Sequence, residues 1–481
     1  MRRPRTRIRP LIAAGAAVLV AGCGTAIQGN PVSVYADPFK VGGMEAVEGP
    51  TGLRPNPKPA AREVTGTDGG EVDNIAGQSI SDLEEFWKFA YPDTFDDELT
   101  PVSAVISWDS DADDGTFCGE STEGFVNAAF CQEDDTIGWD RTVLMPALRK
   151  AHGDMAITMV LAHEYGHAIQ QQATLNPQGV PSLVAEQQAD CLAGSYARWV
   201  AEGKSPRFTL NTGEGLTNLL AAMISVRDPV PSGNDIYTSG DEHGSAFERI
   251  SAFQFGFSDG PSACTAINLP EIKQRRGELP VELPTDQSGE LPVTEASVRS
   301  IIDAMNILFT PKSSPQVSFD PAAASSCPDA RPSSPVSYCP ATNTITVDLP
   351  ALQQIGTPVE GEDGLVLQGD NTAYSALVSR YMMALQSQRG GLALDSAEAG
   401  LRTACLTGVA TTKLSTSITT PDGNTVALTA GDIDEAVAGL LTNGLAAGDV
   451  NGESVPAGFS RIDAFRVGVL GDVESCYTRF G

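Results

Sequence analysis

Residues 160–167 read Val-Leu-Ala-His-Glu-Tyr-Gly-His, and this stretch holds two of the four histidines in a chain of 481 residues. Residues four apart lie one above the other on a helix, so His163 and His167 can bind one metal ion from the same face. Glu164 lies beside them, close to a water that the metal would bind. The spacing therefore predicts a helical zinc site with a carboxylate base, a pattern typical of zinc peptidases.

A second pair of acidic residues completes the predicted site. A catalytic zinc ion usually has three protein ligands and keeps a fourth position open for water. Glu186 and Asp190 are four residues apart, so a helix over about 182–200 places both carboxylates on one face. We expect Glu186 to be the third ligand, and Asp190 to accept a hydrogen bond that orients a ligating histidine. Without the upstream motif, the pair would be interpreted as solvated carboxylates on an amphipathic helix.

These motifs resemble a known family, the neutral zinc metallopeptidases of bacteria. The resemblance rests on the His163 to His167 helix, on Glu-x-x-x-Asp-Cys-Leu-Ala-Gly at 186–194, and on His-Gly-Ser at 243–245 with an arginine at 249 and a cysteine at 264. It covers roughly residues 75–275, and the whole chain with its leader is similar to actinobacterial lipoprotein peptidases of the LpqM type.

The family belongs to the gluzincin group, whose third ligand is a glutamate. The resemblance therefore implies His163, His167 and Glu186 as zinc ligands and Glu164 as the general base. The chain departs from the family pattern at 132–135, where Gln-Glu-Asp-Asp replaces the expected Cys-Pro-Ala run. This departure leaves the contacts to a substrate strand less defined than the metal site.

The first 22 residues are typical of a lipoprotein signal peptide. Arginines precede an apolar run at 11–21, and Leu-Val-Ala-Gly-Cys at 19–23 reads as a lipobox. The apolar run is too short for a stable membrane span. We expect cleavage before Cys23 and acyl chains on that cysteine, which would anchor the protein at the extracytoplasmic face of the cell membrane. The alternative is an ordinary secretory leader in which Cys23 is incidental.

The charge of the chain argues against nucleic-acid binding. The formal net charge is -30, and without the five arginines of the leader 26 basic side chains remain against 61 acidic ones. Such an acidic surface repels nucleic acid and anionic lipid. We therefore expect the membrane contact to be made by lipidated Cys23 alone.

Composition divides the rest of the chain into a tether and two domains. Residues 23–74 are rich in Gly and Pro and lack a helical or strand period, which predicts a flexible tether. A zinc metallopeptidase domain is expected over 75–270, beginning with a helix at 81–90 that a capping box from Ser81 to Glu84 starts. A strand at 102–108 and a helix at 154–172 with Asp154 as N-cap should follow. A Pro/Glu-rich linker over about 269–291 leads to a second domain at 288–481.

Eight cysteines besides Cys23 form two sets of four with matching spacing. The first pairs are 13 and 12 residues apart and the second pairs are 73 and 71 apart. In an exported protein this repeat predicts four disulfides. They are Cys118–Cys131, Cys191–Cys264, Cys327–Cys339 and Cys405–Cys476. Cys191 adjoins Asp190 and could bind metal, but its counterpart Cys405 lies in a half without ligands, which favours the disulfide.

Short segments repeat in the same order as the cysteines. Met-Pro-Ala-Leu at 145–148 returns as Leu-Pro-Ala-Leu at 349–352, and Arg-Ile-Ser-Ala-Phe at 249–253 returns as Arg-Ile-Asp-Ala-Phe at 461–465. In this alignment the positions of the predicted site are taken by Ser379, Arg380, Met383, Gly400 and Ala404. We expect an α+β fold in which a zincin-like domain with the His-Glu-x-x-His helix precedes a degenerate, catalytically dead copy. The alternative is an unrelated second fold with a coincidental repeat.

The predicted activity is hydrolysis of peptide bonds in the cell envelope. Zinc lowers the pKa of its bound water toward about 7, and Glu164 would take the proton as that water attacks a peptide carbonyl. We expect His243 to stabilise the resulting oxyanion, and the alternative is that it is a surface histidine in the loop 239–244. Arg249 could donate instead, although its repetition at Arg461 favours a structural salt bridge.

A different class of function stays open beside the peptidase. It is a non-catalytic binding or scaffold lipoprotein on a peptidase fold, with a structural zinc. Glu164 favours catalysis, because a structural zinc has no use for a carboxylate next to its first ligand. The natural peptide or protein substrate, the choice between endopeptidase and exopeptidase, the role of the second domain and the oligomeric state are not predicted.

Overall fold

The computed structural model describes residues 37–112, 115–176, 179–227, 243–283, 289–358 and 367–481. The predicted signal peptide and Cys23 lie outside these residues. The described residues fall within one compact unit, Ser33–Gly481. We call residues 37–283 the first half and residues 289–481 the second half. Among the described helices, none is both long and apolar enough to cross a membrane.

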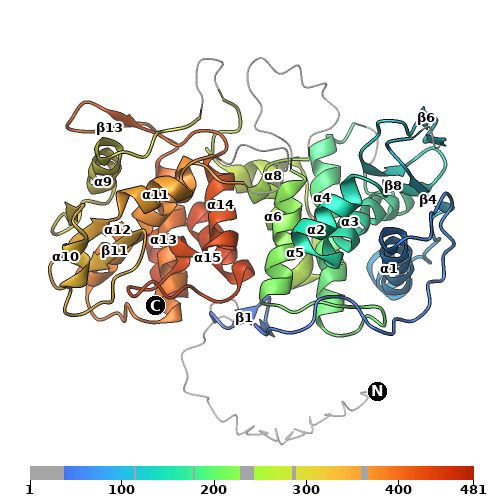
Figure 1. Cartoon of the computed structure of the whole chain (residues 1–481), viewed down its shortest axis with the longest axis horizontal. Coiled ribbons are helices and arrows are strands. Elements are labelled where there is room, and N and C mark those ends of the chain that lie inside the picture. The colour runs from blue at the N-terminus through green and yellow to red at the C-terminus, as the bar shows by residue number, and fades with distance from the viewer. Residues whose placement is uncertain (1–36, 113–114, 177–178, 228–242, 284–288, 359–366) are drawn as a thin grey trace, which may run out of the picture. The chain divides into compact units, whose positions relative to one another are not determined.

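A three-stranded sheet and a set of long helices form the first half (Figure 1). β4 (Ala104–Trp108) pairs in parallel with β8 (Thr136–Asp140), while β7 (Ala128–Cys131) pairs antiparallel with β8 and is an edge strand. The long helices are α1 (Glu71–Phe95), α3 (Asp154–Ala173) and α4 (Ser182–Ala201). α3 packs against α1, α4 and β7, so it runs through the centre of this half.

One stripe of side chains explains why α3 is central. Ile157, Leu161, Tyr165 and Ile169 recur every four residues, and each is almost completely buried. This spacing places them on one face of the helix and seats that face in the core. His163 and His167 lie on the neighbouring face of the helix, so this face can form a polar site.

Shorter elements complete the first half. The strands are β1 (Lys40–Val41), β2 (Met44–Glu45), β3 (Gly52–Leu53), β5 (Thr116–Phe117), β6 (Glu120–Ser121) and β9 (Phe208–Thr209). The helices are α2 (Leu144–His152), α5 (Glu214–Ser225), α6 (Ala246–Asp259), α7 (Pro261–Cys264) and α8 (Leu269–Arg276).

Several predicted boundaries are wrong because tertiary contacts extend or end the elements. The described part of the expected tether is docked on the protein: Leu53 of β3 pairs with Phe208 of β9, and Val41 is fully buried. Strands of two residues have no period that a sequence can reveal. The expected linker contains the helix α8.

Helix starts were also predicted wrongly at two places. α1 begins at Glu71, ten residues before the expected capping box, and the Ser81 hydroxyl donates to the main chain of Gly77 instead. The helix starts early because the buried Asp73 carboxylate accepts hydrogen bonds from Ser107 and Trp139. Asp154 is the first residue of α3 and binds Arg149, so it does not cap the helix. The strand at β4 and the bodies of α3 and α4 are confirmed.

The second half repeats the sheet order of the first. β10 (Gln316–Ser318) pairs in parallel with β12 (Thr344–Val347), and β11 (Val336–Cys339) pairs antiparallel with β12 at the edge. The helices before and after this sheet are α9 (Glu295–Phe309), α10 (Pro321–Ser325), α11 (Leu349–Ile355), α12 (Asp370–Arg389) and α13 (Ala397–Lys413). The remaining elements are β13 (Ile418–Thr419), β14 (Thr425–Val426), α14 (Asp432–Thr442), the 3-10 turn η1 (Leu445–Ala447), α15 (Gly458–Leu470) and α16 (Val473–Arg479).

The four predicted disulfides are confirmed, and each lies at the same place in its half. Cys118–Cys131 and Cys327–Cys339 end the edge strands β7 and β11, whereas Cys191–Cys264 and Cys405–Cys476 fasten α4 and α13. All four Cα–Cα separations are between 5.4 and 5.6 Å, which is normal for a disulfide.

The closest helix crossing is also shared by the halves. α4 crosses α6 where Gly194 faces Phe253 and Gly256 faces Cys191, and α13 crosses α15 where Gly408 faces Phe465 and Gly468 faces Cys405. A Cβ atom on any of the four glycines would overlap a main-chain carbonyl oxygen of the facing helix. Glycine is therefore required at these positions for the helices to approach so closely.

The halves pack against each other through α5 and α6 of the first and α14 and α15 of the second. Main-chain groups meet side chains across this contact: the Phe247 N–H donates to Asp434 at 3.0 Å, and the Gln254 amide donates to the carbonyl oxygen of Phe459 at 3.0 Å. The rings of Phe257 and Phe459 lie 5.1 Å apart. Apolar and polar contacts thus join the two halves into one unit.

We predict that Gly256→Ala destabilises the protein, because the new methyl group would separate α6 from α4. Overpacking of this kind costs about 1–3 kcal/mol of unfolding free energy. Urea unfolding followed by circular dichroism measures the effect. The matched control is Gly49→Ala, where the nearest atom to a new Cβ lies 4.0 Å away. Equal unfolding midpoints for the two variants would show that the crossing is not tightly packed.

Candidate metal centre

The predicted zinc ligands converge in the first half. His163 and His167 come from α3 and Glu186 comes from α4, and their ligand atoms all lie within 4.8 Å of one another. The Nε2 atoms of His163 and His167 are 3.3 Å apart, and the Glu186 carboxylate is 3.0 Å from the first ring and 3.4 Å from the second. A tetrahedron with ligand distances near 2.0 Å has edges of about 3.3 Å. The three donors therefore have the spacing of a zinc site.

The outer ring nitrogens explain why a cation is needed between these donors. Nδ1 of His163 lies 2.8 Å from Asp190, which accepts only, so this nitrogen carries the ring proton. Nδ1 of His167 lies 3.0 Å from the amide oxygen of Gln170 and must also donate. In the neutral rings both Nε2 atoms then present lone pairs to each other and to a carboxylate. Such a donor set is repulsive unless a cation occupies its centre, so the residues fit a zinc ion.

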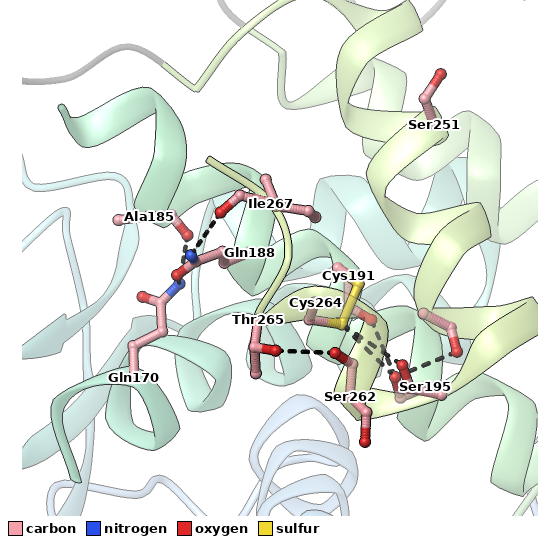
Figure 2. The surroundings of a disulfide bond; sticks show 12 residues. Gln170, Ala185, Gln188, Cys191, Ser195, Ser251, Ser262, Cys264, Thr265 and Ile267 are labelled. Carbon is pink, nitrogen blue, oxygen red and sulfur yellow. Dashed lines mark hydrogen bonds between the residues drawn. A yellow bond between two sulfur atoms is a disulfide. The ribbon is translucent and has the colours of Figure 1, made fainter. Parts of the chain in front are cut away.

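Gln170 is itself held in place by α4. Its Nε2 donates to the main-chain oxygen of Ala185 at 2.5 Å and to the side chain of Gln188 at 3.3 Å. Figure 2 shows these bonds beside the Cys191–Cys264 disulfide, with Gln188 donating in turn to Ile267. The amide cannot rotate without losing these bonds, so its oxygen stays directed at His167.

Asp190 connects the site to a buried arginine. Arg249 of α6 donates to both carboxylate oxygens of Asp190, at 2.9 and 2.8 Å, and both side chains are almost completely buried. A two-pronged contact of this type fixes the plane of the carboxylate. The chain Arg249–Asp190–His163 therefore sets the ring orientation of a predicted ligand from a third helix.

The local charges shift several pKa values in the direction that favours positive charge in this centre. Burial acts to lower the pKa of His163, but the Asp190 and Glu186 carboxylates outweigh it and raise this pKa to about 10. Burial acts in the opposite direction on Glu186, yet both histidines, which donate to this carboxylate when their rings are protonated, hold its pKa below the ordinary value. The centre thus attracts a positive charge strongly.

Glu164 occupies a different position from the three donors. Its carboxylate accepts a hydrogen bond from the main-chain N–H of Phe130 on β7 at 3.0 Å. Burial raises the pKa of Glu164, although the imidazoles of His163 and His167 act against it. A carboxylate with a raised pKa is a stronger base than an ordinary one, which suits the uptake of a proton.

A large open cavity of about 1190 Å³ gives access to these residues. Its walls are the edge strand β7 on one side and the facing turns of α3 and α4 on the other. All three predicted ligands, Glu164 and His243 line it. The donor set therefore lines a cavity whose volume is large enough for several residues of a peptide.

The structure distinguishes the two residues considered for the oxyanion. Nε2 of His243 lies 3.6 Å from the Glu186 carboxylate, and the partly exposed ring faces the cavity. Arg249 also lines the cavity, but its guanidinium donates to Asp190 and to the main-chain oxygen of Val226. These bonds favour a structural salt bridge for Arg249, and the oxyanion role of His243 stays a prediction.

Two contacts of the site were missed from the sequence. Gln170 follows His167 by three residues, so helical spacing could have revealed it as a neighbour on the same face. The Phe130 N–H comes from a strand, and no local pattern could have linked it to Glu164.

In the second half, Arg380 occupies the corresponding face of α12. Its side chain is buried and donates to the main-chain oxygen of Asp449 at 2.7 Å.

We predict that Asp190→Asn lowers zinc affinity about 10–100-fold, because the carboxylate no longer orients His163. It should also cost about 3–5 kcal/mol of unfolding free energy, since Arg249 would be left buried without its partner. Competition with a chromophoric chelator measures affinity, and urea unfolding measures stability. Asp259→Asn, an exposed change on α6, serves as the control. Undiminished zinc affinity in a folded Asp190→Asn protein would remove Asp190 from the site.

Comparison with known proteins places this geometry in a family. The sequence profile described as "Putative neutral zinc metallopeptidase" matches residues 13–267, more than half of the chain. Uncharacterised proteins from Mycobacterium bovis and from two strains of Mycobacterium tuberculosis are each 28% identical over 178 residues. The match covers 33% of this chain and 60% of each relative. No solved structure matches the chain. By its sequence profile, the chain belongs to the neutral zinc metallopeptidase family.

Proposed function

We propose that the protein is a zinc-dependent peptidase whose metal is held by His163, His167 and Glu186. The observation that carries this proposal is the set of three converging donors with Glu164 next to them at the bottom of an open cavity. A structural zinc site is closed by four protein ligands, whereas catalysis needs an accessible position. The open cavity and the extra carboxylate favour catalysis over the scaffold alternative.

Each residue of the site has a separate task in this proposal. A bound zinc ion would supply Lewis acidity, polarising the scissile carbonyl and lowering the pKa of water. Glu164 accepts the proton of the attacking water and returns it to the leaving amine. The Phe130 N–H holds the Glu164 carboxylate in position at 3.0 Å, so the base does not need to reorient during the reaction.

The edge strand β7 supplies a place for an extended substrate. β7 pairs with β8 on one side only, so the main-chain groups of its other side face the cavity. An extended peptide can add to such an edge through main-chain hydrogen bonds. Substrate bound along β7 would pass directly over Glu164, because Phe130 belongs to this strand.

His243 is proposed to stabilise the oxyanion that forms at the attacked carbonyl. The ring lies on the cavity wall near Glu186 and contacts the His163 ring at a centroid distance of 6.4 Å. An imidazole N–H at this position can donate to a developing negative charge. The proposal makes His243 important for turnover and not for metal binding.

We further propose that the protein is a lipoprotein of the cell envelope and that its second half is a degenerate copy of the first. The lipobox at 19–23 supports the anchor. The repeated sheet order, disulfides and glycine crossings support the duplication. The lack of ligand residues at the equivalent positions of α12 and α13 makes the second half catalytically inactive in this proposal.

The test is cleavage of a mixed peptide library by the zinc-loaded protein, with products identified by mass spectrometry. We predict that Glu164→Gln retains one zinc but loses about 10²–10⁴-fold in kcat/KM, because the proton acceptor is removed. Glu120→Gln, an exposed change on β6, should leave the rate unaltered. Metal analysis of every variant separates loss of the base from loss of zinc. Equal cleavage by wild type and Glu164→Gln, or zinc binding without any cleavage, would contradict the proposed mechanism.

A further inference from the structure

A second cavity, of about 370 Å³, lies within the second half, away from the predicted zinc site. It is lined by the first two turns of α12, by α13, and by the chain from β14 to the start of α14. Part of its wall is apolar, with Ile301, Val378 and Leu428 all buried. The rest of the wall carries carboxyl groups. This volume suits a small organic molecule.

Buried carboxyl groups gather at the polar end of this cavity: Asp370 and Asp432 line it, and Glu435 lies close to Asp370 without lining it. Asp370, Asp432 and Glu435 have 5%, 7% and 7% of their surface exposed. Asp370 and Glu435, together with Glu290 at the mouth, bring ligand oxygens within 4.8 Å of one another. Buried acidic groups in such proximity repel each other when they are charged.

One oxygen in this group has no partner within the described protein. Oδ2 of Asp370 accepts from the Leu291 N–H, but Oδ1 is buried without a hydrogen bond. Asp432 and Glu435 do have partners, since they accept from Thr429 and from the Asn371 N–H. A buried carboxylate oxygen without a donor is costly. Oδ1 of Asp370 therefore marks the position where a donor from a ligand belongs.

In the first half, the acidic residue that corresponds to Asp370 has an arginine partner, and the second half has no arginine at that position. Asp154, the first residue of α3, binds Arg149 at 2.8 Å. Asp370 is the first residue of α12, and the repeated Pro-Ala-Leu segments place Gln353 where the first half has Arg149. Gln353 donates to the main-chain oxygen of Val293 instead. The acid is kept, but the arginine that neutralised it is not.

Among the described residues, neither lysine nor arginine forms an ion pair with Asp370, Asp432 or Glu435. Arg227 of the first half interacts electrostatically with Asp434 and Glu435 at the back of the cluster. One arginine on that side does not balance the carboxyl groups that face the cavity.

The cavity exists because a helix is shorter in the second half. α1 has 25 residues and α9 has 15, and both precede the sheet of their half and pack on its long helix. In the first half the early turns of α1 cover the start of α3, where Ser79 binds Thr158 at 2.9 Å. α9 begins too late to do the same for α12. Tyr374 and Ser375 of α12 consequently line a cavity.

We propose that this cavity binds the ammonium group of a primary alkylamine. The ammonium would donate to Oδ1 of Asp370 and neutralise the neighbouring carboxylates, while a short aliphatic chain would lie against Ile301, Val378 and Leu428. A bare divalent cation would satisfy the carboxylates but leave the apolar wall without a contact. The mixed lining therefore favours an organic cation.

Protonation of the cluster gives the proposal a defined pH dependence. Burial raises the pKa of Asp370 to about 7, of Asp432 to about 8 and of Glu435 to about 9. At pH 5.5 these groups are neutral and do not attract an ammonium ion, whereas at pH 8.5 Asp370 and most of Asp432 are charged and can bind the ligand, while Glu435 stays mainly protonated. Glu290, Asp434 and Arg227 also face the cluster and contribute to the same titration. Binding should therefore strengthen with rising pH and release protons to the buffer.

Isothermal titration of the full chain with pentylammonium at pH 8.5 tests the proposal. Aliphatic amines stay protonated at pH 8.5, since their pKa is about 10.4. We expect one equivalent to bind, at least tenfold more weakly at pH 5.5, and 1-pentanol not to bind. Asp370→Asn, which keeps the shape but removes the charge, should lower affinity at least tenfold. Asp395→Asn, an exposed change, should bind as the wild type does.

Two further measurements keep the outcome unambiguous. Thermal unfolding without ligand checks that Asp370→Asn is folded; we expect a higher melting temperature than wild type at pH 8.5, because a buried charge has been removed. Titration with calcium chloride tests the bare cation. Equal binding of pentylammonium by wild type and Asp370→Asn, binding of pentanol as tightly as the amine, or calcium binding without amine binding would each overturn the proposal. None of these measurements depends on peptidase activity.

Discussion

The buried contact between Asp190 and Arg249 is the interaction on which the site depends. It joins α4 to α6, and it reaches α3 as well, because the Nδ1–H of His163 donates to Asp190. A charged pair of this kind is stable in the core only because each charge has its partner, and the full set of hydrogen bonds leaves neither group free to move. The packing of α4 against α6 therefore fixes Asp190, and Asp190 in turn fixes the orientation of the His163 ring.

The helix packing is in turn built to be rigid at this point. Gly194 and Gly256 let α4 and α6 approach until main chains touch, and the Cys191–Cys264 disulfide fixes α4 one residue after Asp190. His167 is oriented from the other side by Gln170, which α4 also holds. Two histidines on one helix thus receive their orientation from α4. The arrangement needs no movement of the main chain to hold a cation among three donors.

The second half has the same frame with different polar chemistry. Its glycine crossing and disulfides are retained, so the rigid packing of helices is preserved. In the proposed alignment of the halves Arg380 takes the position of Glu164, and it lies buried and donates to the main-chain oxygen of Asp449. Acidic groups instead gather at the start of α12, where the first half has an ion pair under α1. The two halves thus share their sheet order, disulfides and glycine crossings but place different polar groups on the long helix after the sheet.

Much of the first half was determined by sequence alone. Helical spacing placed His163, Glu164 and His167 on one face, and the spacing of Glu186 and Asp190 identified the helix that completes the donor set, because these relations are local and follow from 3.6 residues per turn. The repeat of eight cysteines identified the four disulfides, since a duplicated pattern removes the ambiguity of pairing. The mixed α+β class was expected from the resemblance to the zinc metallopeptidases.

Only the tertiary structure decided where the partners of these residues come from. Arg249 is 59 residues from Asp190 and Phe130 is 34 from Glu164, so no periodicity connects them. The docking of residues 37–74 and the early start of α1 depend on burial against β9, β4 and β8, which a local pattern does not contain. The acidic cavity of the second half arises from the absence of helical turns above α12. Charge balance and empty space depend on which distant segments meet, and that is a property of the packed chain.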